Sequence, residues 1–256
     1  MDRKEILYIV LAIFLMTVVF GINDPSENFY LARWFNHLFK VFIFSAIIIL
    51  VHIMGHKFVA NIFKVEARYT LWYFRYLAFT PGMLFTKEEN QEYRGRFFIG
   101  PVITFIIALL SIGRLPILLF DSLEVKIKKN LRIKKLKFFR QAKKYTQLRD
   151  IDEAVVKIAG PLANTLFIFL VSIFIFNYEF YLMSLLFVFF AMIPFPGFDG
   201  GAIFEAKYVY LTTLIFIAIS FFLIYIFQAY ILWLLLFTII ASAIIGVAMY
   251  YLIDVK

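Results

Sequence analysis

Long apolar runs separated by short polar stretches dominate the hydrophobic pattern of this chain. A run of about 20 apolar residues is long enough to cross a bilayer as a helix. The pattern predicts six membrane-spanning helices, at approximately residues 6–20, 38–62, 155–176, 181–193, 210–227 and 229–251. The predicted fold class is therefore an all-α polytopic membrane protein.

One apolar segment, residues 97–120, does not fit a simple span. Gly113, Arg114 and Pro116 interrupt it, and an arginine in mid-bilayer is disfavoured. Basic residues flank the segment on both sides, and basic loops lie preferentially in the cytoplasm. We therefore expect a re-entrant segment that enters and leaves the membrane on the cytoplasmic side.

The segment at residues 66–80 is aromatic and β-branched, with charges interspersed. This composition predicts a strand or small hairpin on the cytoplasmic side of the membrane. Its edge could pair with an extended peptide, or the hairpin could be purely structural. The sequence leaves both interpretations open.

These elements divide the chain into three parts. They are the first helix with an external loop (1–37), a membrane core (38–204) that contains the strand region, the re-entrant segment and a basic cytoplasmic loop (121–152), and two C-terminal helices (205–256). Counting the crossings places both termini in the cytoplasm. We expect an integral, multi-pass protein of the cell membrane.

Composition supports the membrane assignment and narrows the chemistry. The chain is 63% hydrophobic, whereas a soluble domain is about half apolar. It has no cysteine, which excludes a disulfide framework and a thiolate metal site.

Residues 126–149 are rich in lysine and arginine and contain no acid. This run could be a nucleic-acid arm, but its interleaved apolar residues favour contact with anionic lipid headgroups, so no nucleic-acid partner is expected.

Two histidines lie inside the second predicted span. His52 and His56 are four residues apart, so a helix places both imidazoles on one face, one turn apart. Two histidines of a zinc-binding helix have this spacing. Ionisable groups inside an apolar span usually mark a functional site, although the pair could instead be satisfied interior histidines. A catalytic zinc usually has three protein ligands, so a third ligand would decide between these interpretations.

Asp199 is the candidate third ligand. Pro194, Pro196 and Gly197 break the apolar segment before it, and irregular backbone at membrane depth is tolerated where protein or water covers it. Such a break lets a carboxylate turn inward, and the predicted topology puts Asp199 and His56 at cytoplasmic helix ends. The alternative is a plain exit turn, which an Asp-Gly pair commonly marks.

Asn164 lies one turn into the span that begins near Val155. An inward-facing amide could bind a substrate carbonyl group. It could also bond a neighbouring helix, which is the commoner use of asparagine in membranes.

Three motifs stand in order along the chain: His52-Ile-Met-Gly-His56, Gly160-Pro-Leu-Ala-Asn164 and Pro194-Phe-Pro-Gly-Phe-Asp199-Gly. Together they resemble the site-2 protease family of intramembrane zinc metalloproteases, particularly its small prokaryotic and archaeal members. The resemblance covers roughly residues 38–204. It implies that His52, His56 and Asp199 bind one zinc ion and that Asn164 holds the substrate or stabilises the transition state. It also implies that the substrates are transmembrane proteins cut near the cytoplasmic side.

The chain departs from this family at Ile53, where the family motif has glutamate. Such a glutamate takes a proton from water and passes it to the leaving amine, which is worth ~10²–10⁴-fold in rate. Glu66 and Glu205 are not on the right turn of the right helix to replace it. We therefore expect a zinc metalloendopeptidase by resemblance that binds zinc but is catalytically inactive as written, by nature or by engineering.

Two other hypotheses stay open at this point. A non-catalytic pseudo-protease could bind membrane helices or regulate partners, which Ile53 favours. A transporter or metal permease could also use intramembrane histidine and aspartate. The chain lacks the duplicated halves that many transporters show.

Overall fold

The structure, a computed structural model, describes residues 2–23, 30–76, 95–127, 150–205 and 207–226. The helices in these ranges are α1 (Arg3–Gly21), α2 (Leu31–Ile62), α3 (Ile99–Leu110), α4 (Asp150–Phe174), α5 (Tyr178–Ala191), α6 (Asp199–Glu205) and α7 (Lys207–Ile226). The strands are β1 (Val65–Leu71), β2 (Phe74–Tyr76), β3 (Gly95–Phe97) and β4 (Asp121–Ile127). The described part of the protein is thus mainly helical with a small β component.

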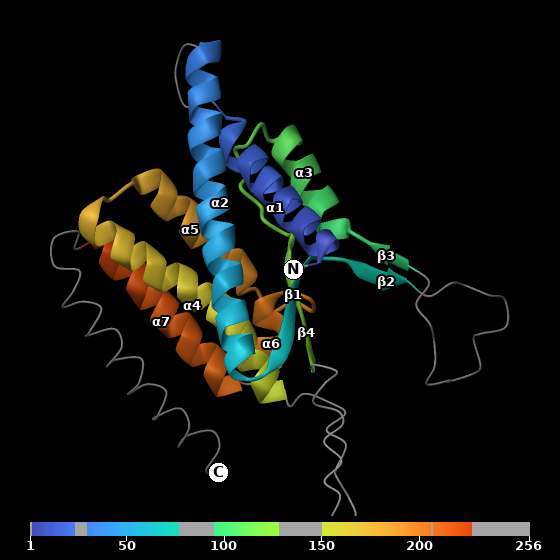
Figure 1. Ribbon diagram of the computed structural model, residues 1–256. Coiled ribbons are helices and arrows are strands. Elements are labelled where there is room, and N and C mark those ends of the chain that lie inside the picture. The colour runs from blue at the N-terminus through green and yellow to red at the C-terminus, as the bar shows by residue number, and fades with distance from the viewer. Residues whose placement is uncertain (1, 24–29, 77–94, 128–149, 206, 227–256) are drawn as a thin grey trace, which may run out of the picture.

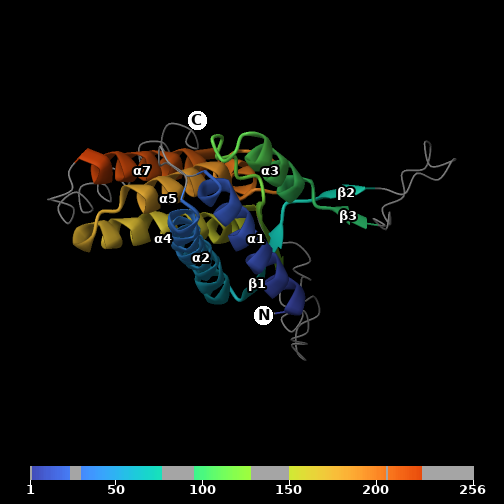
Figure 2. The ribbon, with the colours of Figure 1, turned by 90° about the horizontal axis from the view of Figure 1, so that it is seen from above.

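Helix α2 stands at the centre of the arrangement. Helices α1 and α3 lie on one side of it, and α4, α5 and α7 lie on the other (Figure 1). Seen from above, α4, α5 and α7 run side by side while α2 crosses them (Figure 2). The segment of α2 that carries His52 and His56 faces α4, the helix that carries the motif from Gly160 to Asn164.

Among the described residues, three helices are long and apolar enough to cross a membrane, at Arg3–Gly21, Leu31–Ile62 and Glu153–Ser172. Large apolar side chains on the outside of α2 fit a lipid environment, since Met54 and Phe58 are 68% and 70% exposed. These features indicate a membrane protein. Helix α5 and the apolar part of α7 are shorter, and the sixth predicted span, 229–251, lies outside the described residues. The number of crossings and the side on which the termini lie remain predictions.

Helix α2 is longer than the sequence predicted. It starts at Leu31, so residues 31–37, expected in an external loop, are its first two turns. The predicted boundary between residues 37 and 38 therefore falls within one continuous helix.

The predicted re-entrant segment runs out as a helix and returns as an extended chain. Helix α3 ends at Leu110, and the backbone reverses through Ile112 and Gly113, whose φ angles are 51° and 69°. On the return, the Leu119 N–H donates to Thr104 Oγ1 over 2.9 Å. The start of α3 thus lies beside the end of the return, because a β-carbon on Gly100 would meet the Leu119 carbonyl oxygen. That the segment is re-entrant in a membrane stays a prediction.

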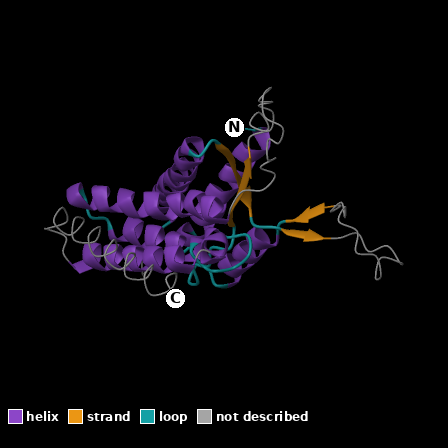
Figure 3. Ribbon diagram, turned by 90° about the horizontal axis from the view of Figure 1, so that it is seen from below, coloured by secondary structure: helices purple, strands orange, loops and turns teal. Residues whose placement is uncertain are grey.

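Two small antiparallel sheets accompany the helices (Figure 3). Strand β1 pairs with β4 from Val65 opposite Ile127 to Leu71 opposite Asp121, and β2 pairs with β3. The strand prediction at residues 66–80 is confirmed as far as Tyr76, and residues 77–94 lie outside the described part. Residues 121–127 of the predicted cytoplasmic loop form β4, and Leu123 of this strand packs into an apolar cluster with residues of β1 and α4. The rest of the basic run, 128–149, is not described.

Candidate metal centre

The two motif histidines lie on the buried face of α2, as their spacing predicts. Their Nε2 atoms are 3.0 Å apart, and the rings meet edge to face. Both side chains are fully enclosed. Two imidazole nitrogens thus lie next to each other inside the protein.

Asp199 brings its carboxylate to the same spot. It is the first residue of α6, and the preceding break lets that short helix start inside the protein. Its Oδ2 atom lies 3.2 Å from His52 Nε2 and 3.0 Å from His56 Nε2. The structure therefore brings together the three residues that the sequence singled out.

The three donor atoms have the spacing that a metal ion needs. Zinc bonds of ~2.0–2.1 Å in tetrahedral geometry place neighbouring ligand atoms about 3.3 Å apart. The edges of the triangle formed by His52, His56 and Asp199 are 3.0, 3.0 and 3.2 Å. Buried carboxylates are costly unless positive charge compensates them, and a divalent cation would do so here. The same donor set also serves iron(II), so the geometry is that of a group that could hold a metal ion, and it does not identify which metal.

The other nitrogens of the two rings have partners of their own. His56 Nδ1 is 2.8 Å from the Val156 carbonyl of α4, so this nitrogen carries the proton and Nε2 is free to bind a metal. Asn164 Nδ2 is 3.5 Å from His52 Nδ1. The structure therefore places Asn164 behind the His52 ring, away from Nε2, and its substrate-binding role stays a prediction.

The two histidine rings explain why the second motif begins with a glycine, Gly160. A β-carbon at this position would lie 2.2 Å from His56 Nε2 and 2.7 Å from His52 Cε1. Any larger residue would push into the imidazole pair. The glycine thus creates the space in which a metal and its two nitrogen ligands can fit.

The turn before Asp199 is fixed by the β1–β4 sheet. Trp72 Nε1–H donates to the Pro196 carbonyl over 3.1 Å, and the Ser122 hydroxyl donates to the Gly197 carbonyl over 2.7 Å. Gly197 has φ +98°, and a β-carbon there would lie 2.7 Å from the Trp72 ring. Two hydrogen bonds and one glycine therefore set the direction in which Asp199 enters the site.

Neither Ile53 nor Glu66 supplies a carboxylate to the three donors. Ile53 is buried in the main apolar cluster. Glu66 is on β1, where it pairs with Arg68 Nε at 2.7 Å. The side chain of Glu205 lies outside the described part of the structure.

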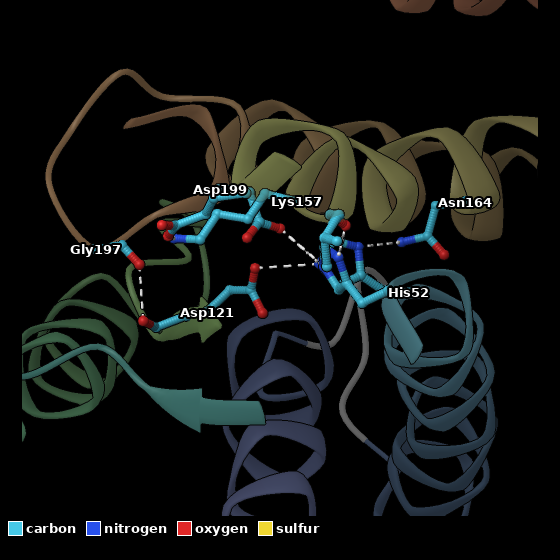
Figure 4. Close-up of polar contacts among 10 residues, drawn as sticks. His52, Asp121, Lys157, Asn164, Gly197 and Asp199 are labelled. Carbon is cyan, nitrogen blue, oxygen red and sulfur yellow. Dashed lines mark hydrogen bonds and ion pairs between the residues drawn. The ribbon is translucent and has the colours of Figure 1, made fainter. Parts of the chain in front are cut away.

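Sequence reasoning missed Asp121, the first residue of β4. It is 4% exposed, and its Oδ2 lies 3.3 Å from His52 Nε2. Figure 4 shows its carboxylate directed toward that ring. An acid that directly follows an apolar run, residues 115–120, was the signal that could have drawn attention to it.

A cavity of about 380 Å³ lies beside the start of α6. Glu153 and Lys157 of α4 line one part of it, and residues of the turn before α6 line another. Lys157 is itself buried, with Nζ 3.6 Å from Glu153 Oε1. The cavity thus lies against the turn that precedes Asp199 and against Gly201 and Ala202 of α6.

Comparison of the chain with protein-family models, curated proteins and solved structures finds no match. The resemblance to site-2 proteases therefore rests on the three motifs alone.

Proposed function

We propose that this protein is an intramembrane zinc metalloprotease of the site-2 type that acts on transmembrane protein substrates near the cytoplasmic side. One observation carries the proposal. Three motif residues that are far apart in the sequence, His52, His56 and Asp199, converge on a triangle with edges of 3.0–3.2 Å. Bound there, zinc would polarise a peptide carbonyl group and lower the pKa of water to about 7.

The surrounding residues support a hydrolytic use of such a centre. Three protein ligands leave one coordination position open, as catalytic rather than structural zinc sites do. His56 is oriented by the Val156 carbonyl, an arrangement typical of metal-ligating histidines. A cavity lined in part by Glu153 and Lys157 lies against the turn that precedes Asp199.

Ile53 is the feature that argues for a second function. Its side chain is 3% exposed and belongs to the apolar cluster of the helix bundle. Because residue 53 is an isoleucine and α2 contains no Asp or Glu, this helix supplies no carboxylate for proton transfer. With the three ligands alone, hydrolysis would be slower by ~10²–10⁴-fold. The alternative function is a metal-binding pseudo-protease that grips membrane helices or regulates partners without cutting them.

Metal content and cleavage test the proposal. Elemental analysis of the full chain purified in detergent is expected to give about one zinc per chain, and neither His56→Ala nor Asp199→Ala should retain it. The variant Ile53→Glu is expected to cut a single-helix membrane peptide. Protein without bound metal would contradict the zinc site. Zinc-loaded Ile53→Glu that binds the peptide but leaves it intact would favour the pseudo-protease.

A further inference from the structure

Asp121 is a buried carboxylate at the metal centre that the ligand triangle does not use. Its Oδ2 lies 3.3 Å from His52 Nε2. The donor atoms of His52, His56 and Asp199 lie within 4.8 Å of one another, and Asp121 is not part of that group. Its carboxylate is therefore a neighbour of the centre and not a fourth member of the triangle.

The oxygens of Asp121 have capacity left to accept hydrogen bonds. Within the described part of the chain, the Tyr69 hydroxyl and the His52 ring interact with this carboxylate, but neither contact has the geometry of a full hydrogen bond. Tyr69 on the paired strand is close by: burial raises its pKa well above the usual value, and the charge of Asp121 adds to this, so its hydroxyl stays neutral. A buried carboxylate with unused acceptor capacity needs a further polar partner, and at a hydrolytic centre the natural partner is a water molecule.

The backbone holds Asp121 in place on both sides. It pairs with Leu71 at the end of the β1–β4 ladder. Before it, the Phe120 carbonyl accepts from the Trp72 N–H at 2.9 Å, and after it, Ser122 is bound to the turn that precedes Asp199. The strand that fixes the metal ligand Asp199 thus also fixes the second carboxylate next to His52.

We propose that Asp121 is the acid–base residue of this centre and supplies from β4 the carboxylate that Ile53 cannot supply from α2. This role rests on the proposed function, because it needs peptide hydrolysis at the site. In that reaction a water oxygen bonds to the scissile carbonyl carbon while one water proton moves to Asp121. The C–N bond then breaks, the proton passes from Asp121 to the leaving nitrogen, and the products are a carboxylic acid and an amine. The chain as written is then an active enzyme.

Four forms of the full zinc-loaded chain test this role: unmodified, Asp121→Asn, Ile53→Glu and the double variant. The probe is a synthetic single-helix peptide with a fluorophore and a quencher on either side of a Gly-Pro break, in detergent micelles. We expect the unmodified chain to cut it and Asp121→Asn to be ~10²–10⁴-fold slower with the same zinc content. The double variant should recover activity, because Glu on α2 then serves the site. Ser45→Ala, which removes a buried hydroxyl without a partner among the described residues, is the matched control.

The outcomes separate this role from the proposed function. Cleavage by Ile53→Glu but not by the unmodified chain would overturn the role of Asp121 and leave the protease function standing. Cleavage by neither would overturn both. Equal rates for the unmodified chain and Asp121→Asn, or loss of zinc from Asp121→Asn, would also overturn the role of Asp121.

A binding measurement tests the same carboxylate without turnover. Acetohydroxamate added to the cobalt-substituted chain binds the open metal position, and its hydroxyl can donate to a neighbouring carboxylate. Loss of a charge-assisted hydrogen bond weakens binding by about tenfold. We expect that loss of affinity in Asp121→Asn, read from the visible absorption of cobalt, and unchanged affinity in Ser45→Ala. Equal affinity in Asp121→Asn would overturn the proposed position of the carboxylate.

Discussion

Gly160 of α4 lies so close to the His56 ring of α2 that a β-carbon on it would be 2.2 Å from the ring's Nε2 atom. The glycine therefore does more than let two helices approach. It leaves empty the volume that a metal ion and its nitrogen ligands require. A substitution at Gly160 can therefore disturb the candidate metal site while the helical fold is kept.

Gly160→Ala should abolish metal binding. At an unhindered helix position, alanine stabilises by about 0.5–1 kcal/mol relative to glycine. Here the added methyl group displaces the His56 ring, so elemental analysis should find little zinc while circular dichroism still reports a helical protein. A variant that binds zinc like the unmodified chain would show that the α2–α4 contact is looser than the structure indicates.

Asn164→Ala distinguishes two roles for this amide. In the structure the amide lies 3.5 Å from His52 Nδ1, on the opposite edge of the ring from Nε2. Loss of a group that orients a ligand typically costs ~10–100-fold in metal affinity. We expect a loss in this range in competition with a chromophoric chelator. Unchanged affinity together with impaired peptide binding would instead support the substrate role that the motif resemblance implies.

The sequence predicts the positions of the candidate ligands better than it predicts the role of Asn164. The spacing of His52 and His56 fixes them on one face of a helix, and the Pro and Gly residues before Asp199 predict the break that turns it inward. Both inferences need only local geometry. The resemblance gives Asn164 a role, but the side of His52 on which its amide lies depends on how α4 is rotated against α2.

Asp121 shows where sequence reasoning stops. Its place at the site follows from the pairing of β4 with β1, whose partner residues are 50–62 positions apart along the chain. No local pattern specifies that register. The basic residues that follow Asp121 instead favour a loop, and so the strand and its carboxylate were missed.

Gly197→Ala should weaken both metal binding and stability. The residue has φ +98°, and its α-carbon faces the Trp72 ring. Holding alanine in such a conformation costs about 1–3 kcal/mol, and relief of the strain would move the turn that aims Asp199. We expect lower zinc affinity and a lower unfolding temperature in detergent. Trp72→Phe is a useful comparison, because it keeps an aromatic ring but loses the hydrogen bond to the Pro196 carbonyl. If Gly197→Ala matches the unmodified chain in both measurements, the turn does not control the ligand.

Glu5→Ala should destabilise the fold without removing the metal. Glu5 is buried on α1 and joins three elements, since Oε1 lies 2.7 Å from Lys57 Nζ of α2 and accepts the Tyr69 N–H of β1 over 3.2 Å. Removing it leaves a backbone donor without its partner, which costs about 1–3 kcal/mol. Thermal unfolding in detergent should show the loss. Lys57→Met, which leaves the Tyr69 bond intact, should cost less, and an equal cost would assign the effect to the ion pair.

Chelation of the metal should destabilise the protein through the same buried centre. Asp199 is wholly enclosed, and the ion-pair contacts of its carboxylate among the described residues are with His52 and His56. A ligand that binds only the folded state stabilises it by about 2.7 kcal/mol at a free concentration 100 times its dissociation constant. Adding a strong chelator should therefore lower the unfolding temperature of the unmodified chain, and restoring zinc should reverse the change. His56→Ala, which lacks one ligand, should unfold at a lower temperature from the start and respond little to either treatment. A chelator effect of equal size in His56→Ala would mean that the metal acts elsewhere on the protein, and no effect on the unmodified chain would contradict a metal at this centre.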